Sequence, residues 1–513
     1  MTDPAATLTG ISKRYDGVVA NDSVDLVLRR GTVHAVMGEN GAGKSTLMSI
    51  LFGLTAPDSG TIVVGGRELR LRGPADAIAA GLGMVHQHFR LFDSMTVAEN
   101  VVYGAEPSRG MLLDRRTAAT RVRELSDRYG LGLDPDATVG RLSAGVRQRV
   151  EIVKALHRDA DILILDEPTA VLTPDEVTSL FAVIRRAADA GSTVVLVTHK
   201  IHEVLAISDE VTVLRAGRVT GRFLTGEVTG RELVEAMTGR DVVSVVNPGR
   251  GEIGDIALEV DGITVHERGV TRLADVSLQL RRGEILGVAG VSGNGQHELV
   301  EAILGAAATS AGSVRIEGRN VTALDVRRRR AAGLAVIPED RRGEGTAITM
   351  TTAENLSVGH HRSAPIGGSG ARRGWLSPSA QRSEAKRLIA DYDIRTGSEQ
   401  TLVGSLSGGN AQKVVIAREL SHEAPVLVAE QPTQGVDVGA IESIHRRLLD
   451  YRDAGRAVLL VSHEISELQA LADRVIVLYS GRVVAEFPKE EATTARIGAA
   501  MTGVAERVGG ELP

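Results

Sequence analysis

The chain has 513 residues with a formal net charge of −6, and 43% of its residues are hydrophobic and 24% charged. This length favours two or more domains, and the charge gives no sign of polyanion binding. The absence of cysteine excludes disulfides, iron–sulfur clusters and thiolate metal sites. Because the sequence shows no secretory signal and no apolar run near the roughly 20 residues that span a bilayer, we expect any membrane role to depend on partner proteins.

The sequence repeats itself once. Residues 29–38 (RRGTVHAVMG) match 281–290 (RRGEILGVAG), and 142–145 (LSAG) match 406–409 (LSGG). The second copy carries extra residues between its two matches, and we read the stretch 361–374 within them as a longer surface loop. A period this long indicates a duplicated domain rather than a solenoid. We therefore expect a first domain at 1–243, a linker at 244–255, a second domain at 256–505 and a tail at 506–513.

Each half begins with alternating apolar residues, at 24–31 and 276–283, which predict antiparallel strands. Short apolar runs follow, such as 161–166 and 193–199, with the helical stretch 174–191 between them. Short, wholly apolar strands separated by helices are typical of buried parallel sheets. The pattern therefore predicts two α/β domains, each with a parallel core and an antiparallel β part.

A glycine-rich loop follows an early strand, GENGAGKST at 38–46, which we call P-loop 1. In such a loop backbone N–H groups surround phosphates, Lys44 neutralises phosphate charge and the Ser45 hydroxyl can bind Mg²⁺. Further along, an apolar strand ends in Asp166, which can hold Mg²⁺, and Glu167, which can polarise an attacking water. The alternatives are a glycine-rich turn that arose by chance and a buried strand that ends in two solvated acids. Neither explains why the acidic pair follows the glycine-rich loop in this order. ATP and Mg²⁺ are thus the expected cofactors.

Two further segments complete a motif set: LSAGVRQ at 142–148 (signature 1) and LSGGNAQ at 406–412 (signature 2). With the loop and DEPT at 166–169, the chain is identified as a member of the ATP-binding-cassette family over nearly its whole length. The resemblance implies two tandem cassettes, each with an added α-helical subdomain, which pair head to tail so that each ATP lies between one P-loop and the opposite signature.

The resemblance also implies residue roles. Nucleotide binding falls to Tyr15, Gly38, Glu39, Asn40, Gly41, Ala42, Gly43, Lys44, Ser45, Thr46, Ser407, Gly408, Gly409 and Asp437, metal binding to Ser45, Gln87 and Asp166, and catalysis to Lys44, Gln87, Glu167 and His199.

Head-to-tail pairing gives two pockets. The pocket formed by the second glycine-rich loop, 290–298 (P-loop 2), and signature 1 has altered residues in almost every motif. Since the changes fall on one pocket only, we expect one hydrolytic and one degenerate site, and the degenerate site could still hold nucleotide weakly. Compared with the first set, the changed residues are Glu267 for Tyr15, Gln296 for Lys44, His297 for Ser45, Glu339 for Gln87, Glu430 and Gln431 for Asp166 and Glu167, Ala144 for a signature glycine and Thr173 for Asp437, while His463 is kept.

Two other features receive plainer interpretations. The run of four arginines at 327–330 is expected to be a solvated helix face rather than a contact with lipid or nucleic acid. The segment 86–88 (HQH) resembles a metal cluster but has no further ligands nearby in the sequence, so we expect no metal there.

A finer resemblance is to the import ATPases for simple sugars and nucleosides, carried by 83–89, 166–174, 290–299, 391–396 and 430–442. The neutral QPT at 431–433 and the HQHF at 86–89 resemble the nucleoside branch most. This implies an ATP-hydrolysing importer subunit, peripheral at the cytoplasmic face of the membrane.

Its implied partners are two transmembrane permease subunits, which provide its only membrane contact, and an extracellular substrate-binding (lipo)protein. No nucleic acid is expected. The segments 88–100 and 339–355 would act as levers on the permeases. Alternatives are a sugar importer ATPase of the ribose or galactose type, a soluble tandem cassette acting on ribosomes or nucleic acid, and a regulatory cassette without a transport partner. Soluble tandem cassettes usually keep two working sites and carry a long charged linker or zinc-binding cysteines.

Overall fold

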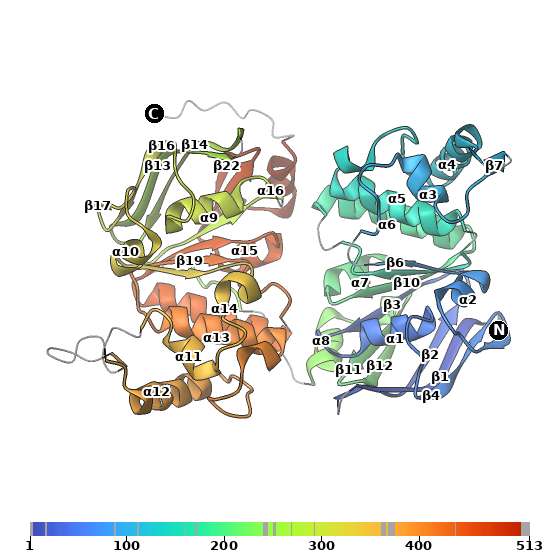
Figure 1. Ribbon diagram of the computed structural model, residues 1–513, viewed down its shortest axis with the longest axis horizontal. Coiled ribbons are helices and arrows are strands. Elements are labelled where there is room, and N and C mark those ends of the chain that lie inside the picture. Colours follow the sequence, from blue (N-terminus) through green and yellow to red (C-terminus); the bar gives the residue numbers. More distant parts are fainter. Residues whose placement is uncertain are drawn as a thin grey trace. The chain divides into compact units, whose positions relative to one another are not determined.

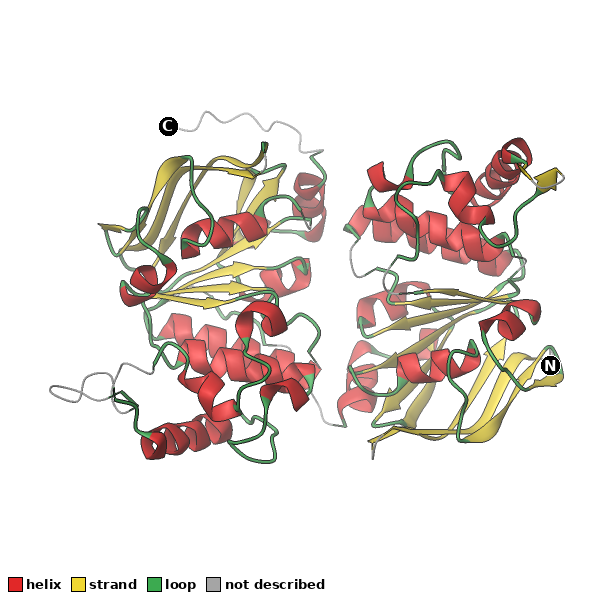
Figure 2. Cartoon of the chain, viewed as in Figure 1, coloured by secondary structure: helices red, strands yellow, loops and turns green. Residues whose placement is uncertain are grey.

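The computed structural model divides into two compact units, residues 1–242 (unit 1) and 243–513 (unit 2). Both units contain the same layers, with helices packed on a parallel sheet and a separate antiparallel sheet (Figure 1, Figure 2). The predicted surface loop at 361–374 falls almost wholly outside the part that can be described. The structure describes residues 4–503 except 16–17, 87–88, 110–111, 159, 170–171, 240–244, 250–252, 268, 292, 361–365, 368–374 and 437.

Unit 1 contains an antiparallel four-stranded sheet in the order β2-β1-β4-β5 and a six-stranded sheet in the order β12-β11-β3-β10-β9-β6. Within the larger sheet all pairs are parallel except β11–β12. A short hairpin, β7–β8, lies apart from both. The strands are β1 (Pro4–Tyr15), β2 (Val18–Arg29), β3 (Val33–Gly38), β4 (Ser59–Val64), β5 (Arg67–Leu69), β6 (Leu82–Val85), β7 (Ser108–Arg109), β8 (Leu112–Leu113), β9 (Ile162–Asp166), β10 (Thr193–Thr198), β11 (Glu210–Arg215) and β12 (Arg218–Leu224).

The helices of unit 1 lie on both sides of the parallel sheet, and α3, α4 and α5 pack on one another as a helical subdomain. They are α1 (Lys44–Leu51), α2 (Pro74–Ala79), α3 (Val97–Val102), α4 (Arg115–Tyr129), α5 (Ala144–Leu156), α6 (Pro174–Asp189), α7 (Ile201–Ile207) and α8 (Gly230–Thr238).

Unit 2 repeats this plan, with sheets in the orders β14-β13-β16-β17 and β18-β19-β20-β15-β21-β22. The strands are β13 (Ile256–Glu267), β14 (Val270–Arg281), β15 (Ile285–Ala289), β16 (Ala311–Ile316), β17 (Arg319–Asn320), β18 (Leu334–Ile337), β19 (Val426–Glu430), β20 (Ala457–Val461), β21 (Arg474–Tyr479) and β22 (Arg482–Pro488). The helices are α9 (Gln296–Leu304), α10 (Val326–Ala331), α11 (Thr352–Ser357), α12 (Pro378–Asp391), α13 (Gly408–Leu420), α14 (Val438–Asp453), α15 (Ile465–Leu471) and α16 (Thr494–Met501).

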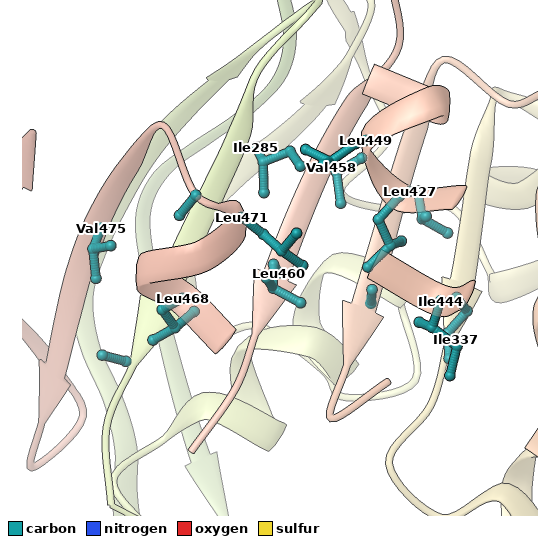
Figure 3. Close-up of a cluster of buried hydrophobic side chains, with 14 of the residues drawn as sticks. Ile285, Ile337, Leu427, Ile444, Leu449, Val458, Leu460, Leu468, Leu471 and Val475 are labelled. Carbon is teal, nitrogen blue, oxygen red and sulfur yellow. The ribbon is translucent and has the colours of Figure 1, made fainter. Parts of the chain in front are cut away.

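Each parallel sheet is buried on both faces, which explains its unbroken apolar runs. In β20, Val458 and Leu460 point into a core shared with the helices, and Figure 3 shows Leu460 beside Leu471 of α15 and Val458 beside Leu449 of α14. The intervening Leu459 belongs to a second core formed with the antiparallel sheet. Successive residues of a strand point to opposite faces, so a two-faced sheet needs apolar residues at every position. The predicted fold class is confirmed.

The described part of the segment between the halves is fastened to unit 2. Asn247 is buried, and its side-chain amide donates to Leu471 O at 2.8 Å and to Asp473 Oδ1 at 2.9 Å. The Arg452 guanidinium donates to Asn247 Oδ1, and the Lys489 ammonium donates to the main-chain carbonyl of Asn247 at 2.6 Å. Residues 245–249 are therefore part of the second fold rather than free chain, which composition alone did not indicate.

The interpretation of residues 327–330 as a solvated face is wrong for two of the four arginines. Arg329 is buried, and its guanidinium donates to the carbonyls of Leu324, Ala302, Ile303 and Thr322. Arg330 pairs with the buried carboxylate of Glu419 at 2.7 Å. A six-residue helix presents different residues to the core and to solvent, so the run of like charges hid two structural positions.

Replacing Arg329 with Met is expected to lower the free energy of unfolding of unit 2 by about 2–4 kcal/mol, because several buried carbonyls lose their donor. Arg328→Met is the matched control, since the Arg328 side chain is 70% exposed, and it should change stability by less than about 0.5 kcal/mol. Chemical denaturation followed by circular dichroism measures both. Equal losses in the two variants would contradict the assigned role.

Candidate nucleotide-binding sites

P-loop 1 joins the carboxyl end of β3 to α1, and its shape depends on glycine. Gly43 has φ 101°, and a Cβ there would lie 2.2 Å from the carbonyl of Ala20. The buried Lys44 curls back so that its ammonium donates to Gly38 O at 2.7 Å and Glu39 O at 3.0 Å. Burial lowers the pKa of Lys44, and nearby carboxylates, Glu167 first, oppose that shift. The ammonium is thus held on the loop where phosphate charge would be neutralised.

A hydroxyl and a carboxylate meet beside Lys44. The Ser45 hydroxyl, in the first turn of α1, donates to the carboxylate of Asp166 at the end of β9. Burial raises the pKa of Asp166, the like charge of Glu167 adds to the rise, and Lys44 opposes it. Magnesium prefers such oxygen ligands in proteins. The residues present therefore fit a Mg²⁺ ion.

Glu167 and His199 come from the ends of two neighbouring strands, β9 and β10. His199 Nδ1 donates to Glu167 Oε1 at 3.1 Å. Glu167 has a left-handed backbone, φ 47°, and its N–H donates to Val197 O at 2.9 Å. The hydrogen bond from His199 is the main cause that lowers the pKa of Glu167, while burial works in the opposite direction. The pair keeps this carboxylate ionised and oriented, as the positioning of a water requires.

His199→Ala is expected to move the acid limb of the ATPase pH profile to higher pH, in addition to slowing turnover. Without the hydrogen bond that lowers the pKa of Glu167, burial raises it, so the carboxylate is protonated at a less acidic pH. Activity that depends on ionised Glu167 is retained above its pKa and lost as pH falls through it. A kcat/KM profile measures the limb, and an unmoved limb would contradict the coupling.

Three expected ligands are less closely tied to this cluster. Tyr15 ends β1 with 44% of its surface exposed, and the Lys13 ammonium lies 5.5 Å from its ring centre. This leaves a ring available for stacking, but the structure does not itself join it to P-loop 1. Gln87 and Asp437 lie outside the described residues, so their assigned roles stay predictions.

P-loop 2 keeps the shape of P-loop 1 with different chemistry. Gly295 has φ 106°, close to the value at Gly43. Gln296 replaces the lysine, is buried, and donates from Nε2 to Val291 O at 3.2 Å. Its amide thus bonds back to its own loop, as Lys44 does, without carrying a charge. Among the described residues, its Oε1 has no hydrogen-bond partner.

The strand end beside P-loop 2 is likewise preserved in shape. Gln431 has φ 46°, and its N–H donates to Val461 O at 2.8 Å, as Glu167 does to Val197. Its side-chain Oε1 accepts from the backbone N–H of His463 at 3.3 Å. His297 Nδ1 donates to Glu430 Oε1 at 3.1 Å, and this contact raises the pKa of His297 to about 9. P-loop 2 and this strand end therefore keep the backbone of their unit 1 counterparts while their side chains differ.

The two signatures differ in a way that the sequence comparison missed. Ser143 caps α5 by accepting from Val146 N, and its hydroxyl donates to Glu176 Oε1 at 3.2 Å. The same carboxylate covers Gly145, where a Cβ would lie 2.3 Å from it. A negative group thus occupies the start of α5, where an anion would otherwise bind. Only the capping-box spacing of Thr173 and Glu176 could have indicated this carboxylate.

Signature 2 is arranged differently. Ser407 precedes α13 without a side-chain capping bond, and its hydroxyl accepts from Asn410 Nδ2 at 2.8 Å. Among the described residues, the Ser407 hydroxyl accepts this one hydrogen bond and donates none. Ala440 stands where Glu176 stands in unit 1, so the described residues place no equivalent carboxylate at the start of α13.

Arg341 is a further residue that the sequence did not single out. Its guanidinium donates to Gln434 O at 2.6 Å, and a Cβ on Gly408 would lie 2.8 Å from it. It therefore links signature 2 to the loop after β19, which contains Gln434 and Gly435.

A buried lysine on a glycine loop, a hydroxyl–carboxylate pair and a histidine-bound glutamate on an α/β sheet define a P-loop nucleotide hydrolase. The sequence matches the ABC transporter family over residues 21–170 and 273–434, and the chain belongs to that family. It is an ATPase of two tandem cassettes, as predicted.

Three relatives show the finer resemblance. The nucleoside import ATP-binding protein NupA of Lactococcus lactis is 42% identical over 96% of this chain and 97% of its own length. The guanosine import ATP-binding protein NupO of Bacillus subtilis is 41% identical over 98% of both chains. The glucose import ATP-binding protein TsgD13 of Haloferax volcanii is 44% identical over 98% of this chain and 96% of its own. The predicted resemblance to nucleoside and simple-sugar import ATPases is confirmed.

A solved complex of the archaeal ribosomal stalk protein aP1 and the ribosome recycling factor aABCE1 covers 93% of this chain and 90% of that chain, with a TM-score of 0.62 and 20% identity. At that identity it shows the shared fold alone. No described helix has the length and apolar character needed to cross a bilayer.

Proposed function

We propose that this chain is the ATP-hydrolysing subunit of a nucleoside importer, bound to two permease subunits at the cytoplasmic face of the membrane. An extracellular binding protein would deliver the nucleoside. The relatives NupA and NupO support this assignment, as do the HQHF and QPT segments. A sugar importer is the second candidate, because TsgD13 is equally similar.

The proposal of a single hydrolytic site depends on one observation: each unit has altered motifs, and the altered motifs of both units would belong to the same pocket. Unit 1 pairs an intact P-loop with a signature that the Glu176 carboxylate covers, and unit 2 pairs an altered P-loop with a signature that has the Arg341 guanidinium beside it. Head-to-tail pairing, which the family resemblance implies, would bring P-loop 1 to signature 2. One pocket then has every working part, and the other has none except His463.

In the working pocket, each residue has a defined task. Lys44 and the backbone N–H groups of P-loop 1 bind the β and γ phosphates, and Ser407 donates to the γ-phosphate from the opposite side. Ser45, Asp166 and Gln87 would hold Mg²⁺, which when bound neutralises charge that develops on the phosphates. Glu167 accepts a hydrogen bond from the attacking water and aligns it, and His199 keeps Glu167 in place.

The permease contact is proposed to lie at two equivalent segments of the cassettes. In unit 1, Phe92 and Tyr103 are exposed beside each other, with ring centres 5.0 Å apart, next to α3. In unit 2, Ile348, Met350 and Val358 are exposed next to α11. Exposed apolar groups of this kind mark protein contact sites.

Both segments have rigid supports. Asn100 Oδ1 accepts from Phe92 N at 2.8 Å, and its Nδ2 donates to Phe92 O and Thr96 O. Asn355 makes the same kind of contacts to Ala347 and Thr351. The segments 88–100 and 339–355 could therefore transmit cassette movement as levers.

Reconstitution tests the proposal. The chain, permease subunits and a binding protein identified from the neighbouring genes would be placed in liposomes with internal ATP, and uptake of labelled nucleosides and of pentoses would be compared. Nucleoside uptake that requires ATP supports the proposal, and uptake of pentoses alone assigns the sugar candidate. Failure to co-purify with any permease, or purification with ribosomes, would overturn both.

A further inference from the structure

The geometry points to a transition-metal site in the degenerate pocket, formed by His297, Glu339 and Glu430 and suited to Zn²⁺. In this site the ion would replace the proton that lies between His297 and Glu430, and the protein would hold it by its own side chains, without nucleotide. The inference concerns unit 2 alone and does not depend on the proposed import function.

The three side chains converge from separate parts of unit 2. His297 is in the first turn of α9, Glu430 ends β19, and Glu339 follows β18. One ligand atom from each lies within 4.8 Å of the other two. By the alignment of the halves, these positions correspond to Ser45, Asp166 and Gln87, the residues assigned to Mg²⁺ in unit 1. Two of the three positions carry histidine and glutamate in place of serine and glutamine, and the third keeps a carboxylate.

The ligand set favours a different metal from the one in unit 1. Imidazole nitrogen and carboxylate oxygen are common zinc ligands, at roughly 2.0–2.2 Å from the ion. Magnesium instead takes oxygen ligands and keeps waters and substrate phosphates in its shell. Three protein ligands with room for water are typical of an open zinc site. Replacing serine with histidine therefore changes the preferred ion from Mg²⁺ to a transition metal.

An unsatisfied oxygen gives an independent indication of a bound cation. The Glu430 side chain is buried, and while Oε1 accepts from His297, its Oε2 has no hydrogen-bond partner among the described residues. A buried carboxylate oxygen without a donor is costly, and a metal ion would satisfy it. The two oxygens share one carbon, so the unsatisfied one lies at the cluster itself.

The surroundings favour a cation further. Glu301 Oε1 lies 3.9 Å from His297 Nε2 and adds a further negative charge beside the cluster. Gln434 Nε2 donates to Glu339 Oε1 at 3.2 Å and so orients that ligand from behind. Such supporting hydrogen bonds are typical of metal ligands.

Little movement is needed to close the site. Ligand atoms around a tetrahedral zinc ion are about 3.4 Å apart, so the set, which lies within 4.8 Å, must contract by at most about 1.4 Å. His297 Nδ1 already lies 3.1 Å from Glu430 Oε1, so the movement falls mainly on Glu339, which is partly exposed.

The test uses the full-length chain without an affinity tag, stripped with EDTA, free of nucleotide and with excess Mg²⁺ present. Titration calorimetry with ZnCl₂ and the visible absorption of added Co²⁺ are the readouts. His297→Ser and Glu339→Gln each install the residue type of unit 1. His422→Ala is the matched control, because His422 stacks on His360 with ring centres 3.7 Å apart, outside the cluster.

We expect one Zn²⁺ per chain, a Co²⁺ spectrum of low coordination number, and at least a tenfold loss of affinity in both cluster variants. His422→Ala should bind as the unaltered chain does. Thermal unfolding without metal checks that each variant is folded. Absence of stoichiometric binding in excess Mg²⁺, unchanged affinity in the cluster variants, or loss only in His422→Ala would overturn the inference.

Discussion

Glu167→Gln is expected to reduce ATP turnover by about 10²–10⁴-fold, while ATP binding is retained. Glutamine keeps the shape of the side chain but cannot accept a proton or keep the charge that pairs with His199. Phosphate release under saturating ATP measures turnover, and equilibrium binding of a labelled nucleotide measures retention.

Gln431→Ala is the matched control for that variant, because Gln431 has the same backbone conformation at the same point of unit 2. It should leave most turnover intact, since the residue has no role in the working pocket. Substantial turnover in Glu167→Gln, or a collapse in Gln431→Ala, would contradict a single hydrolytic site.

Ser407→Ala is expected to lower turnover by about 10²-fold, because removing one preorganised donor to a charged oxygen has effects of that size. Stability should change little, since the Ser407 side chain does not cap α13. Steady-state ATPase assays and thermal unfolding measure the two quantities.

Ser143→Ala should show the reverse result. Its hydroxyl caps α5 and donates to Glu176, so its loss should lower stability by about 1 kcal/mol and change turnover less than about twofold. Equal effects on turnover in the two serine variants would contradict the pairing of P-loop 1 with signature 2.

Much of the working site could be read in advance because its groups are neighbours along the chain. The residues proposed to bind phosphate in P-loop 1 are consecutive, and Asp166 and Glu167 are adjacent at one strand end. The sequence also shows which copy of each motif is altered, since Gln296 and Gln431 each stand where the first copy has a charged residue. Alternation and apolar runs were enough for the fold class, because they follow directly from one-faced and two-faced burial.

Other features depended on contacts between distant segments. The cover of Glu176 over signature 1, the buried position of Arg329, and the attachment of Asn247 to unit 2 each join residues that no local pattern relates. The burial of a side chain depends on which other segments pack on it. A run of arginines therefore has the same sequence pattern whether its side chains face solvent or buried carbonyls.

By itself, the sequence determined the family, the duplication and which P-loop keeps its catalytic charges, because backbone-binding loops and strand-end acids are local chemistry. Only the tertiary structure decided which signature has an available serine, and that His297, Glu339 and Glu430 converge on one point. The reason is physical: the polarity of a pocket is the sum of groups from several strands and helices, and their separation in space is set by sheet order and packing, not by their spacing along the chain.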